Sequence, residues 1–232
     1  MRQTNRATRA RRCCLAALLA TAVSVSGAQA GETLQQERVR LVASIEKTMA
    51  DQASREAAII AGKERSLLCA SCHGVDGNSH KSDMPNLAGQ NPAYIVEQII
   101  HFAEGVRRNF VMQALTREFT FEDKVNLAVF YNTQPVKPIA FDAVRATRGE
   151  GVYARSCFRC HGENGRGEAG YARLAGQQIE YVEMTLKRYR ANANSRNDPR
   201  ERRRSDASME QVSAILSDQE IGDVAHFIAS MR

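Results

Sequence analysis

The chain is poor in several residue types that usually fill a protein core. Its 232 residues include no tryptophan and only five prolines, and aromatic residues make up 6% of the total. No stretch of alternating apolar and polar residues is long enough to predict a β-sheet, so we expect an all-α fold. Small helical units with so few aromatic side chains bury a modest core. A large apolar cofactor would compensate for that deficit.

Cysteine is absent outside two short motifs and the N-terminal segment. Of the six cysteines, Cys13 and Cys14 lie in that segment, and the other four belong to the motifs. Once the segment is removed, no thiol remains for a disulfide, for thiolate ligation of a metal or for nucleophilic catalysis.

The first 30 residues have the pattern of a secretory signal peptide. Residues 1–12 carry five arginines and no acidic residue, and residues 13–25 are mostly apolar. Ala28 and Ala30 place small residues at positions −3 and −1 of a cleavage site after Ala30. The apolar stretch is short for a membrane span, although a retained N-terminal anchor is the alternative. We therefore expect export of the mature protein to the periplasm.

The charge of the chain argues against nucleic acid as a partner. The formal net charge is +6, and loss of the five N-terminal arginines would leave about +1. Neither this balance nor the placement of the aromatic residues is typical of a nucleic-acid-binding surface. One basic segment, residues 196–204, contains five arginines. We expect a solvated loop there, which could dock an acidic partner.

Two copies of the sequence C-x-x-C-H indicate the chemistry. They occupy residues 69–73 and 157–161. Two thiols three residues apart can each form a thioether with one vinyl group of a haem, while the adjacent imidazole reaches the iron. The predicted attachment residues are Cys69, Cys72, Cys157 and Cys160, and the predicted proximal iron ligands are His73 and His161.

Other uses of paired cysteines are possible. Four cysteines can bind one zinc ion, and an isolated C-x-x-C pair can be a thioredoxin-like redox site. The two motifs lie 88 residues apart, and a histidine follows each pair. Both facts favour two covalently bound haem c groups over these alternatives.

Internal repetition indicates two domains. The sequence LAGQ occurs at residues 87–90 and again at 174–177, and residues 119–131 match residues 216–228 at a separation of 97. Each repeat predicts a helix that ends at the haem motif, a Gly-rich loop, a second helix and a closing helix. The predicted divisions are a signal peptide (1–30), an N-terminal helical extension of unassigned role (31–52) and two domains (53–136 and 137–232).

The same 97-residue separation selects the candidates for the second axial ligand. Met112 and Met209 share it, whereas His80, His101 and His226 have no histidine counterpart. A methionine can also be a simple packing residue, but two at one register of two haem repeats favour ligation. Ligation by His and Met fills both axial positions and raises the reduction potential relative to ligation by two histidines. This pattern favours electron transfer over catalysis at the iron.

With its paired C-x-x-C-H, LAGQ and methionine motifs, residues 53–232 resemble the cytochrome c4 family. The resemblance implies two tandem cytochrome c domains, each wrapped around one covalently bound haem, with Met112 and Met209 on the irons. It also implies that the carbonyl of Pro85 orients the proximal histidine, a position where the second repeat has Ala172.

The expected function is the transfer of single electrons between redox proteins in the periplasm, without enzymatic activity. The expected donor is a membrane cytochrome complex or a dehydrogenase, and the expected acceptor is a terminal oxidase of a respiratory chain or a similar protein. The alternative is a dihaem electron-transfer subunit of a periplasmic dehydrogenase complex. Peripheral association with a membrane is compatible with either.

Fast electron transfer between two haems requires their edges to lie close together. We therefore expect the domains to pack with approximate two-fold symmetry. Small and apolar residues should line the contact, and residues 196–204 should face solvent away from it.

Overall fold

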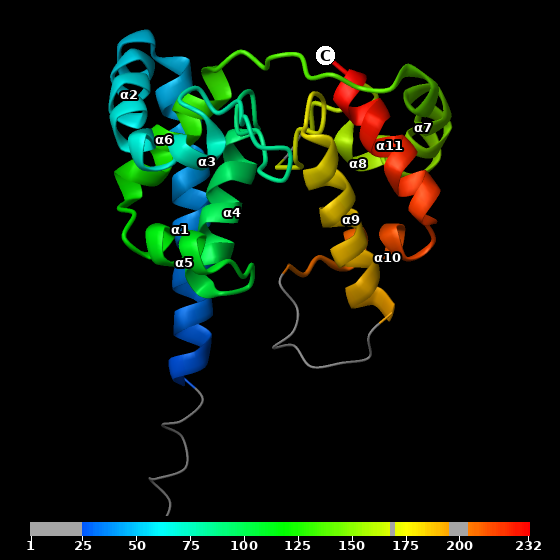
Figure 1. The fold of residues 1–232 in the computed structure, drawn as a ribbon. Coiled ribbons are helices and arrows are strands. Elements are labelled where there is room, and N and C mark those ends of the chain that lie inside the picture. The colour runs from blue at the N-terminus through cyan, green and yellow to red at the C-terminus, as the bar shows by residue number, and fades with distance from the viewer. Residues whose placement is uncertain (1–24, 168–169, 195–203) are drawn as a thin grey trace, which may run out of the picture. The chain divides into compact units, whose positions relative to one another are not determined.

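The computed structural model describes residues 25–167, 170–194 and 204–232, and in these ranges it contains helices and no β-strand (Figure 1). None of the helices in the described ranges is long and apolar enough to span a membrane. The chain divides into two units, residues 1–39 and residues 40–232. The predicted signal peptide falls largely on residues 1–24, outside the described ranges.

The helices follow the predicted repeat. Those up to the end of the first repeat are α1 (Val25–Ala50), α2 (Gln52–Arg65), the 3₁₀ helix η1 (Ser66–Leu68), α3 (Ala70–His73), α4 (Pro92–Glu104), α5 (Phe110–Arg117) and α6 (Phe121–Thr133). The second repeat contains α7 (Ala143–Ser156), α8 (Phe158–His161), α9 (Ile179–Asn194), α10 (Ala207–Ala214) and α11 (Asp218–Ser230). The closing helices of both repeats, α6 and α11, begin with capping boxes, from Thr120 to Asp123 and from Ser217 to Glu220.

In the unit formed by residues 40–232, the last turns of α1 belong to the core of the first repeat. Leu41 and Ile45 are 0% and 5% exposed and pack in one cluster with α4 and α6, and Met49 packs against that cluster. The sequence assigned no role to the N-terminal extension (31–52). The structure shows that its last turns cover an apolar face of the first repeat.

Each repeat is closed by a close crossing of its first and last helices. A Cβ atom placed on Gly62 of α2 would lie 2.3 Å from the backbone oxygen of Asn126 in α6. At the equivalent position of α7, a Cβ on Gly149 would lie 2.1 Å from the backbone oxygen of Asp223 in α11. The two crossings therefore require glycine at the same place in each repeat, because the helix backbones touch there.

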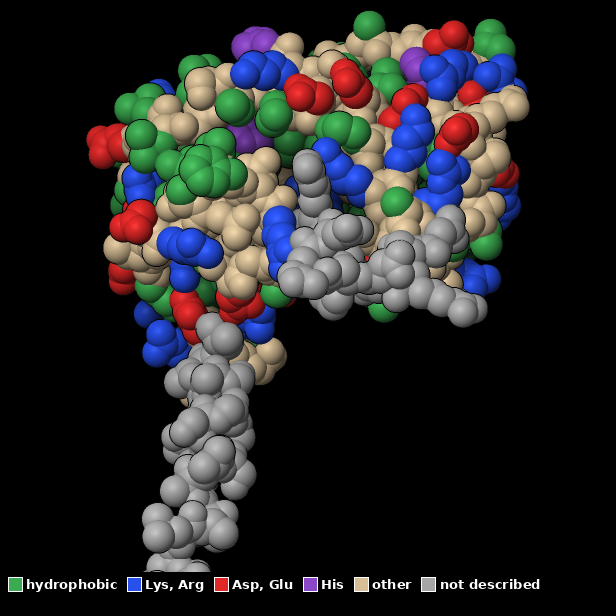
Figure 2. Space-filling view, turned by 60° about the horizontal axis from the view of Figure 1, so that its bottom comes forward, with side chains coloured by type: hydrophobic (Ala, Val, Ile, Leu, Met, Phe, Trp, Pro, Cys, Tyr) green, Lys and Arg blue, Asp and Glu red, His purple; other side chains and the backbone are tan. Residues whose placement is uncertain are grey.

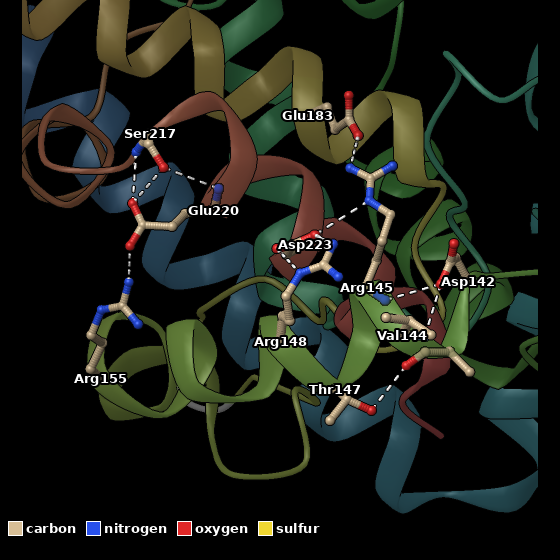
Figure 3. Close-up of polar contacts among 11 residues, drawn as sticks. Asp142, Val144, Arg145, Thr147, Arg148, Arg155, Glu183, Ser217, Glu220 and Asp223 are labelled. Carbon is tan, nitrogen blue, oxygen red and sulfur yellow. Dashed lines mark hydrogen bonds and ion pairs between the residues drawn. The ribbon is translucent and has the colours of Figure 1, made fainter.

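The second crossing also carries an ion-pair cluster (Figure 3). The side chain of Asp223 on α11 is buried, and its carboxylate accepts hydrogen bonds at 2.8 Å from both Nε and Nη2 of Arg148 on α7. Arg145, one turn earlier on α7, lies 3.4 Å from the same carboxylate. These bonds satisfy a carboxylate that would otherwise be buried without a partner.

Hydrogen bonds of side-chain amides join the two repeats, so the prediction that small and apolar residues line the contact is wrong for the residues that form these bonds. The amide of Gln90 bonds the backbone of Arg173, and the amide of Gln177 bonds the backbone of Asn86. Gln178 adds a hydrogen bond of 2.8 Å to the carbonyl of Ser79. The loops after the haem motifs meet here, and their buried peptide groups need hydrogen-bond partners that apolar side chains cannot supply.

The predicted solvent-facing position of residues 196–204 is wrong for Arg204. Residues 196–203 lie outside the described ranges. The guanidinium of Arg204 donates to the hydroxyls of Tyr94 in the first repeat and Tyr181 in the second, and it stacks 5.2 Å from the ring centre of Tyr189. A half-buried guanidinium that contacts three tyrosines binds the repeats together and is not free to dock an external partner.

Candidate functional site

One cavity of about 1000 Å³ extends through both repeats. Apolar side chains form most of its wall, and the lining includes His73 and Met112 from the first repeat and His161 and Met209 from the second. The structure therefore brings together all four residues that the sequence selected as iron ligands. The volume is at the upper end of the range for small-molecule sites.

The haem motifs sit at helix ends that are built alike. In the first repeat, α2 continues through η1 to Leu68, directly before the motif, and in the second repeat α7 ends directly before it; the histidine then closes a single following turn, α3 or α8. Within this turn the backbone N–H of His73 donates to the carbonyl of Cys69 at 2.9 Å, and that of His161 donates to the carbonyl of Cys157 at 3.1 Å. All four predicted attachment residues are free thiols, and Cys69, Cys157 and Cys160 line the cavity.

Both histidines are held by a backbone carbonyl. Nδ1 of His73 lies 2.9 Å from the oxygen of Pro85, and Nδ1 of His161 lies 2.9 Å from the oxygen of Ala172. Because a carbonyl only accepts, Nδ1 carries the proton and Nε2 keeps its lone pair for a metal. The substitution of Ala172 for proline changes nothing here, since the acceptor belongs to the backbone.

The two imidazoles are suited to metal ligation because they are neutral. His73 and His161 are 7% and 9% exposed. Burial lowers the pKa of each ring below the usual value for histidine, since a charged ring would lose its hydration. Each ring can therefore offer Nε2 to a metal over the whole neutral range.

Both methionines occupy the same place in equivalent short helices. Asn109 is the N-cap of α5, and its side-chain oxygen accepts a hydrogen bond of 3.0 Å from the backbone N–H of Met112. Asp206 caps α10 and accepts an equivalent bond of 2.9 Å from Met209. Each methionine thus lies three residues inside a capped helix, which fixes its backbone at the cavity wall.

The other histidines have different surroundings. His101 also lines the cavity, but its Nε2 lies 2.7 Å from a carboxylate oxygen of Glu97. His226 accepts a hydrogen bond of 2.9 Å from the backbone N–H of Asp142 through Nδ1. Neither histidine has a histidine at the equivalent position of the other repeat, which agrees with their exclusion as paired ligands.

The cavity fits haem c. Haem is an apolar plate with two carboxylates, and the wall offers an apolar surface with two buried polar atoms that have no hydrogen-bond partner among the described residues. These are the hydroxyl of Tyr131 and Nε of Arg173. Burial lowers the pKa of Arg173, as expected for a cation short of a counter-charge. The donor set of each site is one imidazole and one thioether, both typical axial ligands of haem iron.

Sequence reasoning missed two groups of cavity residues. Val42, Ile45 and Met49 of α1 line the cavity, although α1 precedes the repeats. Their spacing of three and four residues marks one helix face, but nothing in the spacing shows which core that face covers. The second group is formed by Arg107 and Arg204, which the cavity wall shares with Tyr94 and Tyr181.

A family model described as cytochrome c matches residues 146–232. Cytochrome c4 from Thiocapsa roseopersicina is 35% identical over 175 residues, which is 71% of this chain and 87% of that protein. The chain belongs to the cytochrome c4 family. The membership confirms the predicted fold of tandem cytochrome c domains and the predicted class, an electron-transfer cytochrome with covalently bound haem c.

Two further matches place this cytochrome among solved and studied proteins. The crystal structure of reduced recombinant cytochrome c4 from Pseudomonas stutzeri superposes with a TM-score of 0.65 at 26% identity, and the match covers 74% of this chain and 97% of that one. A protein named thiosulfate dehydrogenase electron acceptor from Stutzerimonas stutzeri is 29% identical, with 71% of this chain and 79% of that protein covered.

Proposed function

We propose that this cytochrome holds two haem c groups and transfers single electrons between periplasmic redox proteins. One haem is attached to Cys69 and Cys72 and ligated by His73 and Met112. The other is attached at Cys157 and Cys160, with His161 and Met209 as its axial ligands. Bound haem would supply a one-electron iron couple to each site.

The observation that carries this proposal is the shared cavity. Candidate ligands of both repeats line the same space, so two groups bound there would lie close enough for electrons to pass between them. Each site offers two axial ligands from the protein, a neutral imidazole and a thioether. With both positions filled, no coordination site is left for a substrate, which favours electron transfer.

The acceptor that we propose is a terminal oxidase of a respiratory chain.

The charge pattern of the surface bears on how a partner is recognised. Figure 2 shows acidic and basic side chains interspersed over one face of the described surface, without a broad field of one sign. Long-range steering by a single-sign patch is therefore not a feature of this face. Recognition there would depend on local contacts at short range.

A second candidate role is that of electron acceptor for a periplasmic dehydrogenase. It is favoured by the 29% identity with the thiosulfate dehydrogenase electron acceptor of Stutzerimonas stutzeri, which extends over most of both chains. The two roles share the same haem sites and differ in the protein that supplies electrons.

The haem sites are tested on the purified mature protein. Mass spectrometry should show two covalent haem additions, and Cys69→Ala or Cys157→Ala should each weaken one attachment and leave the haem of the other repeat in place. Fewer than two additions in the parent protein would contradict the proposal. A redox titration with visible spectra should show low-spin haem with the signature of methionine ligation in both sites.

The two roles are separated by donor and acceptor assays. The reduced cytochrome is mixed with membranes that contain a terminal oxidase, and the oxidised cytochrome is mixed with a thiosulfate dehydrogenase and thiosulfate. Rapid oxidation in the first assay alone supports the respiratory role, whereas rapid reduction in the second supports the dehydrogenase role. Co-purification with a dehydrogenase subunit would favour the second role independently.

Localisation is tested by fractionation and N-terminal sequencing. The proposal expects the holoprotein in the periplasmic fraction with Gly31 as its first residue. In the uncleaved chain the predicted cleavage site lies within α1, which begins at Val25. Recovery of a chain that still begins at residue 1 in the membrane fraction would indicate a retained anchor instead.

A further inference from the structure

In each repeat, the peptide group that binds the axial histidine is held from its other side by the opposite repeat. The peptide between Pro85 and Asn86 accepts from Nδ1 of His73 at 2.9 Å through its carbonyl oxygen. The N–H of the same peptide donates to Oε1 of Gln177 at 2.7 Å. A single planar amide thus joins an iron-ligand histidine of one repeat to a glutamine of the other.

The second repeat contains the same arrangement with the roles exchanged. The peptide between Ala172 and Arg173 accepts from Nδ1 of His161 at 2.9 Å. Its N–H donates to Oε1 of Gln90 at 2.6 Å. Gln90 and Gln177 are the last residues of the two LAGQ motifs, so the repeated sequence and the reciprocal contact coincide.

Further bonds fix the orientation of both glutamine amides. Nε2 of Gln177 donates to the carbonyl of Asn86 at 3.0 Å, and Nε2 of Gln90 donates to the carbonyl of Arg173 at 3.0 Å. Oε1 of Gln90 also accepts from the backbone N–H of the residue that follows it, and so does Oε1 of Gln177. Two N–H groups on each Oε1 exclude the flipped amide. Gln90 and Gln177 are 5% and 6% exposed, so water does not compete for these bonds.

Hydrogen bonds on opposite sides of one amide strengthen each other. A bond accepted by Oε1 from the peptide N–H draws electron density toward the peptide carbonyl oxygen, which becomes a better acceptor for Nδ1–H. A stronger bond at Nδ1 makes Nε2 a more basic ligand, and such outer hydrogen bonds are one of the means by which a protein tunes haem iron. A more basic ligand stabilises the oxidised iron and lowers the reduction potential.

We propose that Gln177 positions the peptide group that binds His73 and so tunes the haem ligated by His73. Gln90 plays the equivalent part for His161 and its haem. Each repeat therefore sets part of the potential of the other's haem through a chain of glutamine amide, peptide group and imidazole. This inference rests on the proposed haem sites. Its chemical consequence is that the two potentials depend on the contact between the repeats.

The test uses Gln177→Met in the full-length holoprotein, because methionine nearly keeps the length of the side chain and removes its amide. The haem at His73 should become easier to reduce, with its reduced-to-oxidised ratio rising about threefold at a fixed potential, or ~30 mV for a one-electron couple. The haem at His161 should keep its potential. The reciprocal variant, Gln90→Met, should produce the opposite pattern.

Two measurements assign the effect to the correct haem. Redox titration followed by NMR of the axial-ligand resonances reports each haem separately, with Met112→His and Met209→His used for assignment. The ¹⁵N shift of Nδ1 in His73 should move in Gln177→Met while that of His161 does not. A merely structural role for the glutamine would not move one imidazole selectively.

The matched control is Gln178→Met. Gln178 also bonds across the contact, to the carbonyl of Ser79 and to the side-chain oxygen of Asn86, but its side chain does not bond the peptide group that holds His73. It should leave both potentials and both Nδ1 shifts unchanged. Equal shifts of both haems in Gln177→Met, a shift of the haem at His161 instead, or the same shift in Gln178→Met would overturn the inference.

Failure of this inference is distinguishable from failure of the proposed function. If the parent protein lacks two haems with His and Met ligation, the proposed function is wrong. If both haems are present with those ligands and neither Gln90→Met nor Gln177→Met changes a reduction potential, the proposed function stands and the link between the repeats is absent. Should Gln177→Met fail to retain haem, Gln90→Met tests the same link from the other side.

Discussion

Arg107 and Arg204 are equivalent residues of the two repeats, and each reaches the tyrosine of the opposite repeat. Arg107 donates to the hydroxyl of Tyr181 at 3.0 Å, and Arg204 donates to that of Tyr94. They lie 97 residues apart, the same separation that relates Met112 to Met209. The approximate two-fold relation therefore includes charged residues as well as the amide contacts of the LAGQ motifs.

The two arginines also change the chemistry of the tyrosine between them. Burial raises the pKa of Tyr181, but the charges of Arg107 and Arg204 act against it and lower the pKa to about 7. Both arginines lie at the cavity wall. The contact between the repeats thus places two positive charges at the cavity wall.

Arg204→Met should loosen the contact between the repeats. The variant loses the hydrogen bonds to Tyr94 and Tyr181, a loss of about 1.5–3 kcal/mol for bonds that involve a charged group. Local opening should therefore speed hydrogen exchange of the Tyr181 backbone amide, which donates across the contact to the carbonyl of Ser82, by roughly 10- to 150-fold.

The matched control for this experiment is Arg155→Met. Arg155 forms an exposed ion pair with Glu220 within the second repeat, so its loss should leave exchange at Tyr181 unchanged. Equal acceleration in both variants, or none in Arg204→Met, would show that Arg204 does not hold the repeats together.

The sequence predicted the all-α fold and the repeated order of helices because these features depend on residues that are close in the chain. It also selected Met112 and Met209, since the repeat supplied a register, and the structure places both at the cavity wall. The same register also pairs Arg107 with Arg204. However, Arg204 belongs to a segment with five arginines, and such a segment is usually solvated, so its contact with the tyrosines was not predicted. Local composition does not show which member of a charged run finds a buried partner.

The contact between the repeats and the role of α1 could not be predicted in the same way. Gln90 and Gln177 are ordinary polar residues in a loop, and their partners lie 83 and 91 residues away. Only the folded structure shows that their amides supply the hydrogen bonds that water would otherwise make to these buried peptide groups. Likewise, the apolar face of α1 predicts burial but does not identify the core that Leu41 joins.

Met112→His and Met209→His should each lower the reduction potential of one haem and keep it low-spin. Imidazole replaces a softer thioether that favours reduced iron. A redox titration with visible spectra checks this, and the spectral signature of methionine ligation should be lost from one haem per variant.

Met49→Leu is the control for the methionine experiment. Met49 lines the same cavity from α1 without a counterpart in the second repeat. The Met49→Leu substitution should leave the spectra of both haems unchanged. If Met49→Leu removes the methionine signature and Met112→His does not, Met49 is the ligand of the first site.

Gly149→Ala should destabilise the second repeat. The new Cβ would lie 2.1 Å from the backbone oxygen of Asp223, so the α7–α11 crossing must open, at a cost of about 1–3 kcal/mol for overpacking. Gly151→Ala on the same helix is the matched control. A Cβ at residue 151 meets nothing within 4 Å. Replacing this helical glycine by alanine should leave the free energy of unfolding unchanged or raise it by up to about 1 kcal/mol. Thermal unfolding of both holoproteins measures the difference, and similar midpoints would contradict the crossing geometry.

Asp223 should make the stability of the second repeat depend on pH in the acid range. Hydrogen bonding from Arg148 lowers the pKa of the Asp223 carboxyl below its usual value, against the opposing effect of burial. A carboxyl with a depressed pKa in the folded state stabilises the fold above its unfolded value of about 4, and this contribution is lost as the pH falls through the folded pKa.

The Asp223→Asn variant tests that dependence directly. It should unfold at lower denaturant concentration than the parent at pH 7, because the ion pair with Arg148 is lost. The difference should narrow below about pH 4, where the Asp223 carboxyl of the parent becomes protonated first in the unfolded chain and then, at lower pH, in the folded protein. Glu150→Gln, on the exposed face of α7, is the control and should show no such convergence. A constant difference between Asp223→Asn and the parent from pH 7 to pH 3 would mean that the carboxylate charge does not stabilise the crossing.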